Sequence, residues 1–205
     1  MPSDVVNVFG FGLHLAQSGK KHEQAKPLKG FGGASVLELV EDHMGDTFRA
    51  VYTVKIAERV YVLHCFQKKS TKGIETPRQD MDLIRERLKA ALAHAKGAEM
   101  IEIEKGSANI YEDLGLPDAA EMQVKATLAA KIGEIIKHRH LTQVQAAEIL
   151  GMPQPKLSGM LRGQFRGISE AKMLACMNRL GRDVQIVVLK PSRSRVTGRT
   201  SVVFT

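Results

Sequence analysis

The sequence predicts an α+β protein in which an antiparallel sheet with helices precedes a mainly α-helical part that carries one short strand. Three runs rich in β-branched and aromatic residues follow one another in the first half, at 35–42, 47–54 and 59–69. In the second half, residues 141–163 have the pattern of a helix, a tight turn and another helix. Apolar residues make up 43% of the chain and charged residues 25%, as in globular proteins, so packed cores are expected.

The 205 residues are enough for two small domains, and the boundary between them is predicted just after residue 96. A helix ends there at Lys96 and Gly97, and Met100 precedes a polar run of the kind that often opens a chain. We therefore divide the sequence into a first domain, a linking segment, a helical domain and a basic tail, at 1–96, 97–120, 121–190 and 191–205.

The charge of the chain favours a polyanionic partner. The formal net charge is +8, of which +3 precedes residue 100 and +5 follows it. A basic surface attracts nucleic acid through a salt-sensitive field, although charge that only keeps the protein soluble is the alternative. Both halves of the chain are therefore candidates for nucleic-acid binding.

The cysteines and the apolar runs exclude several classes of protein. Cys65 and Cys176 lie far apart and form no CxxC pair, so we expect no disulfide framework, no zinc site and no cofactor. No apolar run approaches the roughly 20 residues of a membrane span, and no charged-then-apolar leader follows Met1. We expect a cytoplasmic protein that makes no contact with a membrane.

The first half is predicted to begin with a helix end, a basic segment and a glycine-rich turn, within residues 14–33. Glycines at this turn either expose backbone N–H groups to a phosphate or only allow the chain to turn. The short gaps between the three strands predict antiparallel hairpins and a meander. If the second hairpin turns about Ile56 and Ala57, one face of the sheet carries Phe48, Tyr52, Val62 and Phe66, and the other Arg49, Cys65 and Gln67.

A helix over 76–96 is predicted to cover this sheet. Thr76 and Gln79 have the spacing of a capping box, and Pro77 suits the first helical position. Apolar residues then recur at helical spacing, at Met81, Ile84, Leu88 and Leu92.

The second half contains the most specific local pattern. Thr142 and Gln145 form a predicted capping box at the start of a short helix that ends near Gly151. A second short helix begins near Gln154, with Pro155 in its first turn. Ala147 is small where the helices meet, and the residues expected in the core are Val144, Leu150, Leu157 and Leu161.

Elements on both sides complete the helical domain. Val124, Leu128, Ile132 and Ile135 predict an amphipathic helix before the motif, and a helix is predicted after it over 169–180. Residues 183–189 are predicted to form a strand, and its unpaired edges favour pairing with a second copy across a two-fold axis. The basic tail either contacts DNA or keeps the protein soluble.

Residues 121–182 resemble the helix-turn-helix domain of the Cro/C1, or XRE, regulators. The resemblance implies that the second short helix enters the major groove, where glutamine amides read adenine edges or contact phosphates. The positions it assigns to DNA binding are Thr142, Gln143, Gln154, Lys156, Ser158, Arg162 and Arg166. A helical hairpin that binds only protein is the alternative interpretation.

Residues 10–96 resemble the HigB/Gp49-like branch of the RelE toxins, which are ribosome-associated mRNA interferases. The motifs that carry this resemblance are AKPLKGFGG, DTFRAVYTV, VYVLHCFQKKS and GIETP. The stretch IEKGSANIYEDLGLPDAA and the motif after it are similar to the HigA antitoxins. The chain thus resembles a toxin and its antitoxin joined in one polypeptide, with a toxin half that is expected to be truncated at its N-terminus.

The toxin resemblance implies metal-independent RNA cleavage by the 2′-hydroxyl of the substrate, which needs proton transfer and fixed positive charge at the phosphate. It assigns catalysis to Arg49, Lys68 and Lys69, and RNA binding to Lys26, Lys29 and Gln67. His64 is either an acid–base group or a core histidine, and the predicted register favours the core.

Two functions from different classes follow. In the first, the chain is a toxin–antitoxin protein, in which a HigA-like repressor is fused to an interferase domain that is masked or impaired. Its expected partners are operator DNA, mRNA on the ribosome, a second copy of the chain, and toxin–antitoxin contacts within or between chains. In the second, the chain is a DNA-binding regulator whose first half is a non-catalytic interaction module. A general RNA-binding module without cleavage is a third interpretation of the first half.

Overall fold

The computed structural model describes residues 1–31, 35–68, 76–97, 103–190 and 197–205. The chain divides into two compact units, Met1–Ala108 and Asn109–Thr205, and each is considered by itself. Among the described residues, no helix is long and apolar enough to cross a membrane.

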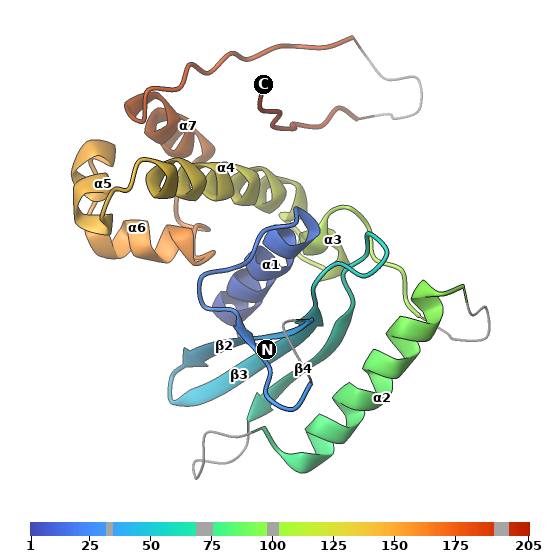
Figure 1. Cartoon of the computed structure of the whole chain (residues 1–205). Helices are drawn as coiled ribbons and strands as arrows, with labels where there is room; N and C mark the ends of the chain where they lie inside the picture. The colour runs from blue at the N-terminus through green and yellow to red at the C-terminus, as the bar shows by residue number, and fades with distance from the viewer. Residues whose placement is uncertain (32–34, 69–75, 98–102, 191–196) are drawn as a thin grey trace. The chain divides into compact units, whose positions relative to one another are not determined.

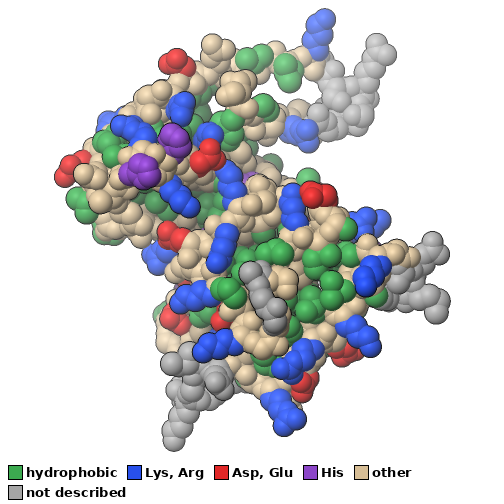
Figure 2. Space-filling model, in the orientation of Figure 1, with side chains coloured by type: hydrophobic (Ala, Val, Ile, Leu, Met, Phe, Trp, Pro, Cys, Tyr) green, Lys and Arg blue, Asp and Glu red, His purple; other side chains and the backbone are tan. Residues whose placement is uncertain are grey.

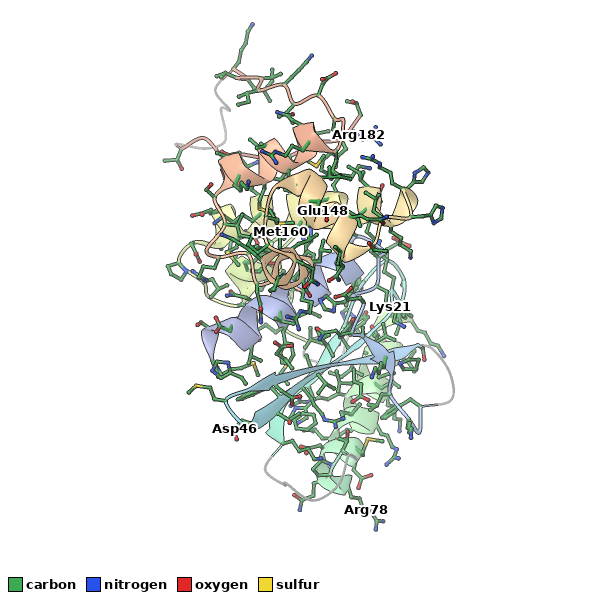
Figure 3. The ribbon with its side chains drawn as sticks, turned by 90° about the vertical axis from the view of Figure 1, so that its left-hand side faces the viewer. Lys21, Asp46, Arg78, Glu148, Met160 and Arg182 are labelled. Atoms are coloured by element: carbon green, nitrogen blue, oxygen red, sulfur yellow. The ribbon has the colours of Figure 1, made fainter. Side chains whose placement is uncertain are left out.

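The N-terminal unit is built on a four-stranded antiparallel sheet with the order β1-β2-β3-β4. The helix α1, Ser3–Gln17, precedes the sheet and contacts β2. The helix α2, Arg78–Ala95, follows the sheet and contacts β4. The two helices cover opposite faces of the sheet (Figures 1 and 3). The strands are β1 at Lys26–Pro27, β2 at Val36–His43, β3 at Asp46–Thr53 and β4 at Val62–Lys68.

The predicted meander is confirmed, because β2, β3 and β4 pair in sequence as antiparallel hairpins. Both hairpins turn through residues with positive φ. In the first turn these are Met44 and Gly45, and in the second they are Ala57 and Glu58. Two successive residues with positive φ are typical of the tight turns whose twist matches that of paired strands.

The predicted face assignment holds for β3 and for Val62 but is wrong for residues 65–67 of β4, because the second hairpin turns one residue later than expected and β4 carries a bulge. Arg49 lies opposite Phe66, and Phe48 lies opposite Gln67. The register shifts between Val51 and Tyr52, which lets Tyr52 pair with Val62. Side chains alternate between the faces of a strand, so Arg49 and Phe66 share a face, whereas Phe48 and Gln67 lie on the other.

The two faces of the sheet are both packed. On the α2 side, a core cluster joins strand and helix residues, including Val36, Val51, Leu63 and Ile84. On the α1 side, Gly12 approaches Leu39 so closely that an added Cβ would lie 2.6 Å from Leu39 Cδ2. A glycine at this position therefore allows α1 to lie close to the sheet.

The helix α2 forms as predicted, but its predicted cap does not. The N-cap residue is Pro77, which makes no side-chain capping bond. The Thr76 hydroxyl instead accepts a hydrogen bond from Arg49 Nη1 at 3.2 Å. Ile84 is fully buried and Met81 and Leu88 pack against the core, but Leu92 is 42% exposed. Ala91 takes the buried position in its place.

The C-terminal unit is helical. Its first two helices are α3, Ile110–Asp113, and α4, Ala119–His138. They are followed by α5, Gln143–Leu150, α6, Gln154–Leu161, and α7, Glu170–Arg179. The predicted stripe of α4 is confirmed, since Val124, Leu128, Ile132 and Ile135 are all buried. On α7, Met173 and Met177 are buried, and Leu180 is buried at its end.

The strand predicted over 183–189 is not formed in the single chain. Ile186 is 83% exposed and Val188 is 93% exposed, and no strand pairs with this segment in the part of the unit that the structure describes. A β-strand needs a neighbour to accept its backbone hydrogen bonds, and the helices of this unit offer none. The result is an exposed apolar segment that follows the last helix.

Candidate nucleic-acid interfaces

Caps at both ends of α5 define where this helix starts and where the chain turns towards α6. The Thr142 hydroxyl accepts from the backbone N–H of Gln145, and the Gln145 side chain accepts from the backbone N–H of Thr142 at 2.9 Å. Gly151 then closes the helix in the left-handed conformation, with φ of 60°. A residue with a side chain would be strained at this positive φ, although the neighbouring Arg179 guanidinium could move aside for it.

Four residues on the inner faces of α5 and α6 form the core of the motif. Ala147, Leu150, Leu157 and Met160 are buried, and three of these were predicted. Val144 was predicted in the same core but is 60% exposed, because it lies on the outer side of the first turn of α5. Leu161 is half-buried. The spacing of the motif therefore predicted its turn better than it predicted each core residue.

The two glutamines that the sequence singled out contact each other. Gln154 Nε2, in the first turn of α6, donates to Gln143 Oε1, in the first turn of α5, at 2.7 Å. This bond leaves Gln154 with one free N–H donor and its amide oxygen as acceptor, which is the pair of groups that an adenine edge requires. The Gln143 amide nitrogen remains available to donate to a phosphate. The two side chains thus hold each other in position.

The other predicted DNA-binding residues lie near this pair. Lys156 is exposed on α6, and Ser158 and Arg162 are half-buried on the same short helix and at its end. Four residues at the end of α4 were not predicted as binding residues, although a run of basic types before a capped helix is a visible signal. They are exposed and comprise Lys137, His138, Arg139 and His140. Basic and histidine side chains gather on this part of the surface (Figure 2).

Arg166 occupies a different setting from the other candidates. Its guanidinium forms an ion pair with the Asp118 carboxylate, which lies before α4. Its backbone carbonyl accepts from Lys125 Nζ at 3.2 Å, and the same ammonium pairs with Glu121 at 2.5 Å. These contacts tie the loop after α6 to the first turns of α4. Arg166 therefore has a structural partner at the position where a phosphate contact was predicted.

In the N-terminal unit, Arg49 is buried and ion-paired. Its Nη1 lies 2.5 Å from Glu38 Oε2 and 3.2 Å from the Thr76 hydroxyl. The side chain is only 7% exposed. Its charge is therefore neutralised by a carboxylate, and Thr76, just before α2, contacts the same nitrogen. Glu38 was not foreseen as its partner, because the pairing depends on the register of three strands.

The remaining predicted RNA-site residues are spread over both faces and both edges of the sheet. Lys26 is exposed on β1 directly opposite Glu38, and the strand alternation puts Lys68 on the same face as Arg49. Gln67 is exposed on the other face. Lys29 is exposed in the loop after β1, and Lys69 lies outside the described residues. The structure brings Lys26, Arg49 and Lys68 to one face, but it does not gather the whole predicted set.

His64 links β4 to α2. Its Nδ1 lies 3.3 Å from Arg87 Nη1, and because a guanidinium can only donate, Nδ1 is the acceptor. The proton then resides on Nε2, which lies 3.1 Å from Asp80 Oδ1. The ring also stacks on Phe66 at 4.8 Å between centroids. With both ring nitrogens bonded, His64 fits the predicted core histidine better than it fits an acid–base group.

Other reactive groups offer little for catalysis. Desolvation raises the pKa of the Cys65 thiol to about 11, and the nearby Arg87 guanidinium opposes this only in part. The thiol therefore stays protonated near neutral pH and is a poor nucleophile. Within the described ranges, no three His, Cys, Asp or Glu side chains come together as metal ligands.

Comparisons with known proteins match each unit separately. Residues 1–89 match the family model of the phage-derived Gp49-like proteins, and residues 110–189 match a helix-turn-helix domain model. No curated protein matches the chain. A solved structure described as "Putative XRE Family Transcriptional Regulator" is 39% identical, covers 43% of this chain and 100% of its own, and has a TM-score of 0.41.

Proposed function

We propose that this chain, which joins a Gp49-like domain of the RelE/HigB toxin type to an XRE-type helix-turn-helix DNA-binding domain, is a toxin–antitoxin protein that represses transcription from an operator. The observation that carries the proposal is the bond between Gln143 and Gln154, because it fixes an amide at the start of α6 with the groups that read adenine. Both side chains are half-buried at the starts of α5 and α6.

In this proposal α6 lies in the major groove and Gln154 reads a base edge. Gln143, Thr142 at the start of α5, and the basic residues around them contact phosphates, which set the register without reading sequence. Two copies of the chain pair through residues 183–189, so that two copies of α6 face successive turns of the duplex. The operator is then a palindrome that reflects the two-fold axis.

Replacing Gln154 by Ala tests the role of α6. We expect the variant to lose preference for the operator over duplexes changed at one adenine of each half-site, because one bidentate contact contributes about 1–3 kcal/mol of discrimination. Lys156→Ala is the matched control on the same helix, and it should weaken binding to all duplexes alike and lower the salt dependence. Fluorescence anisotropy with a panel of duplexes separates the two effects. An equal, sequence-independent loss in both variants would show that the recognition helix is misplaced.

For the N-terminal domain we propose an mRNA interferase that is masked or impaired in the intact chain. Support comes from the Gp49-like match and from the exposed cations Lys26 and Lys29. The ion pair between Arg49 and Glu38 favours a second candidate, a non-catalytic interaction module, because a neutralised arginine gives little charge to a phosphate. Masking by the helical domain, within a chain or between copies, is helped by the tether, which raises the effective concentration of the partner.

Expression of residues 1–108, the compact N-terminal unit, separates the two candidates. If the domain is a masked interferase, the isolated unit arrests translation and cuts ribosome-bound mRNA, whereas the full chain does not. The control is the same unit with Lys68→Ala, which leaves the ion pair of Arg49 and Glu38 intact. Normal translation in the presence of soluble, folded unit would contradict interferase activity and leave the interaction module.

A further inference from the structure

A groove runs along the outer side of α2, away from the residues that the sequence assigned to catalysis. It has a volume of about 450 Å³ and lies between the helix and the loop after β1. Its apolar lining comes from one aromatic, two leucines and Ala93, and its polar lining consists of cations. The principal lining residues are Phe31, Arg85, Leu88, Lys89, Leu92 and Lys96.

The charged side chains that line the groove are all cations, and one of them, Arg85, is ion-paired with Asp82. Arg85, Lys89 and Lys96 line it, and no carboxylate does. Lys89 and Lys96 are exposed, and neither has an ion-pair partner in the part of the chain that the structure describes. Two unpaired ammonium groups beside an apolar surface attract an anionic ligand that also has an apolar part.

The aromatic residue gives the groove a planar surface. The Arg85 guanidinium lies over the Phe31 ring at 5.8 Å from its centroid, and Asp82 holds that guanidinium through a bond of 2.7 Å to Arg85 Nη1. Phenyl rings and guanidinium planes are the surfaces on which unpaired RNA bases stack. An acidic peptide would need the cations but would not need the stacked pair.

The groove continues into the loop that carries a predicted RNA-binding residue. Gly30, with φ of +86°, lies next to Met81 and Arg85 of α2, so the loop contacts the helix there. Lys29 precedes this glycine and is exposed. Lys29, Arg85, Lys89 and Lys96 therefore form a basic path from the loop along the outside of α2.

We propose that this groove binds single-stranded RNA, with a base on the Phe31–Arg85 pair and successive phosphates on Lys89 and Lys96. The inference rests on the proposed function only in assuming that the N-terminal domain acts on RNA, and it does not require cleavage. Binding here positions a strand and leaves the chemistry to the sheet, so no residue of the groove is a catalytic residue.

The test uses the full chain and a short fluorescein-labelled oligouridylate, with anisotropy measured over a range of salt. The double variant Lys89→Gln, Lys96→Gln should bind more weakly, and its salt slope should fall by about 0.7 for each lysine. The matched control, Lys21→Gln with Lys105→Gln, removes two exposed lysines of the same unit outside the groove and should change neither quantity by as much. Phe31→Leu should weaken binding by about five-fold or more at an unchanged slope, since it removes stacking and keeps the charge.

Two results would overturn the inference. In the first, the groove and control double variants bind the oligouridylate with equal affinity and slope. In the second, Phe31→Leu has no effect and poly-glutamate competes as well as RNA, which would make the groove a site for an acidic polypeptide. The groove variant could lose RNA binding while residues 1–108 cause no translational arrest. That combination would support this inference and contradict only the interferase proposal.

Discussion

At the scale of single residues, Arg49 departs most from its predicted role. From its sequence, Arg49 was predicted to place a positive charge at the RNA phosphate. In the fold it instead pairs with the Glu38 carboxylate on the adjacent strand, 2.5 Å away. Burial of such a pair costs desolvation that only good geometry and further hydrogen bonds offset, and the Thr76 hydroxyl supplies one of these. The pair therefore helps to fix the start of α2 on the sheet, through the bond to Thr76.

Glu38→Gln tests this structural role. The change keeps the shape of the side chain and removes its charge, so a guanidinium that is 7% exposed loses the charge of Glu38 beside it. We expect the free energy of unfolding to fall by about 1–3 kcal/mol, measured by urea denaturation monitored by circular dichroism. The control is Glu58→Gln, which removes an exposed partner of Lys55 and should leave the midpoint unchanged. Equal midpoints for both variants would contradict the account of Arg49.

At the scale of elements, local patterns predicted more than long-range ones. The capping box of Thr142 and Gln145 and the left-handed Gly151 were predicted because caps and turns depend on residues a few positions apart. The β4 residues that share the face of Arg49 were predicted wrongly, since a turn shifted to Ala57 and Glu58 and a bulge opposite Val51 change the register of β4. Neither change has a signal in the sequence that is independent of tertiary packing.

The segment 183–189 belongs to the same scale, because its β-strand pattern was recognised but its partner is not within the chain. Its exposed side chains at 186–189 are 70–93% accessible, which is unusual for β-branched and leucine residues. Ile186→Asp should place a charge at the centre of the proposed two-fold pairing and convert a dimer into monomers, as measured by sedimentation. Val203→Asp is the matched control, being 81% exposed in the tail.

The dimer proposal fails under either of two findings. One is a native chain that sediments as a monomer at concentrations well above those that saturate its DNA. The other is an Ile186→Asp variant that remains dimeric while Val203→Asp does too.

At the scale of the whole molecule, two compact units follow one another in one chain, and each matches a different family model. The sequence predicted both kinds of domain because their motifs are local and dense, and the two glutamines that it singled out contact each other at the starts of α5 and α6. It did not predict the groove on α2, because Phe31 and Lys96 come together only through the packing of a loop on a helix. In the proposed function, a DNA-binding domain and a basic Gp49-like domain act within one chain.

The most direct test of that account is a footprint of the purified full chain on the promoter of its own gene, at low ionic strength. The account predicts protection of two half-sites about one helical turn apart, and a clear preference for the promoter over a scrambled duplex of equal length. Equal affinity for the two duplexes, with no defined protected region, would contradict it.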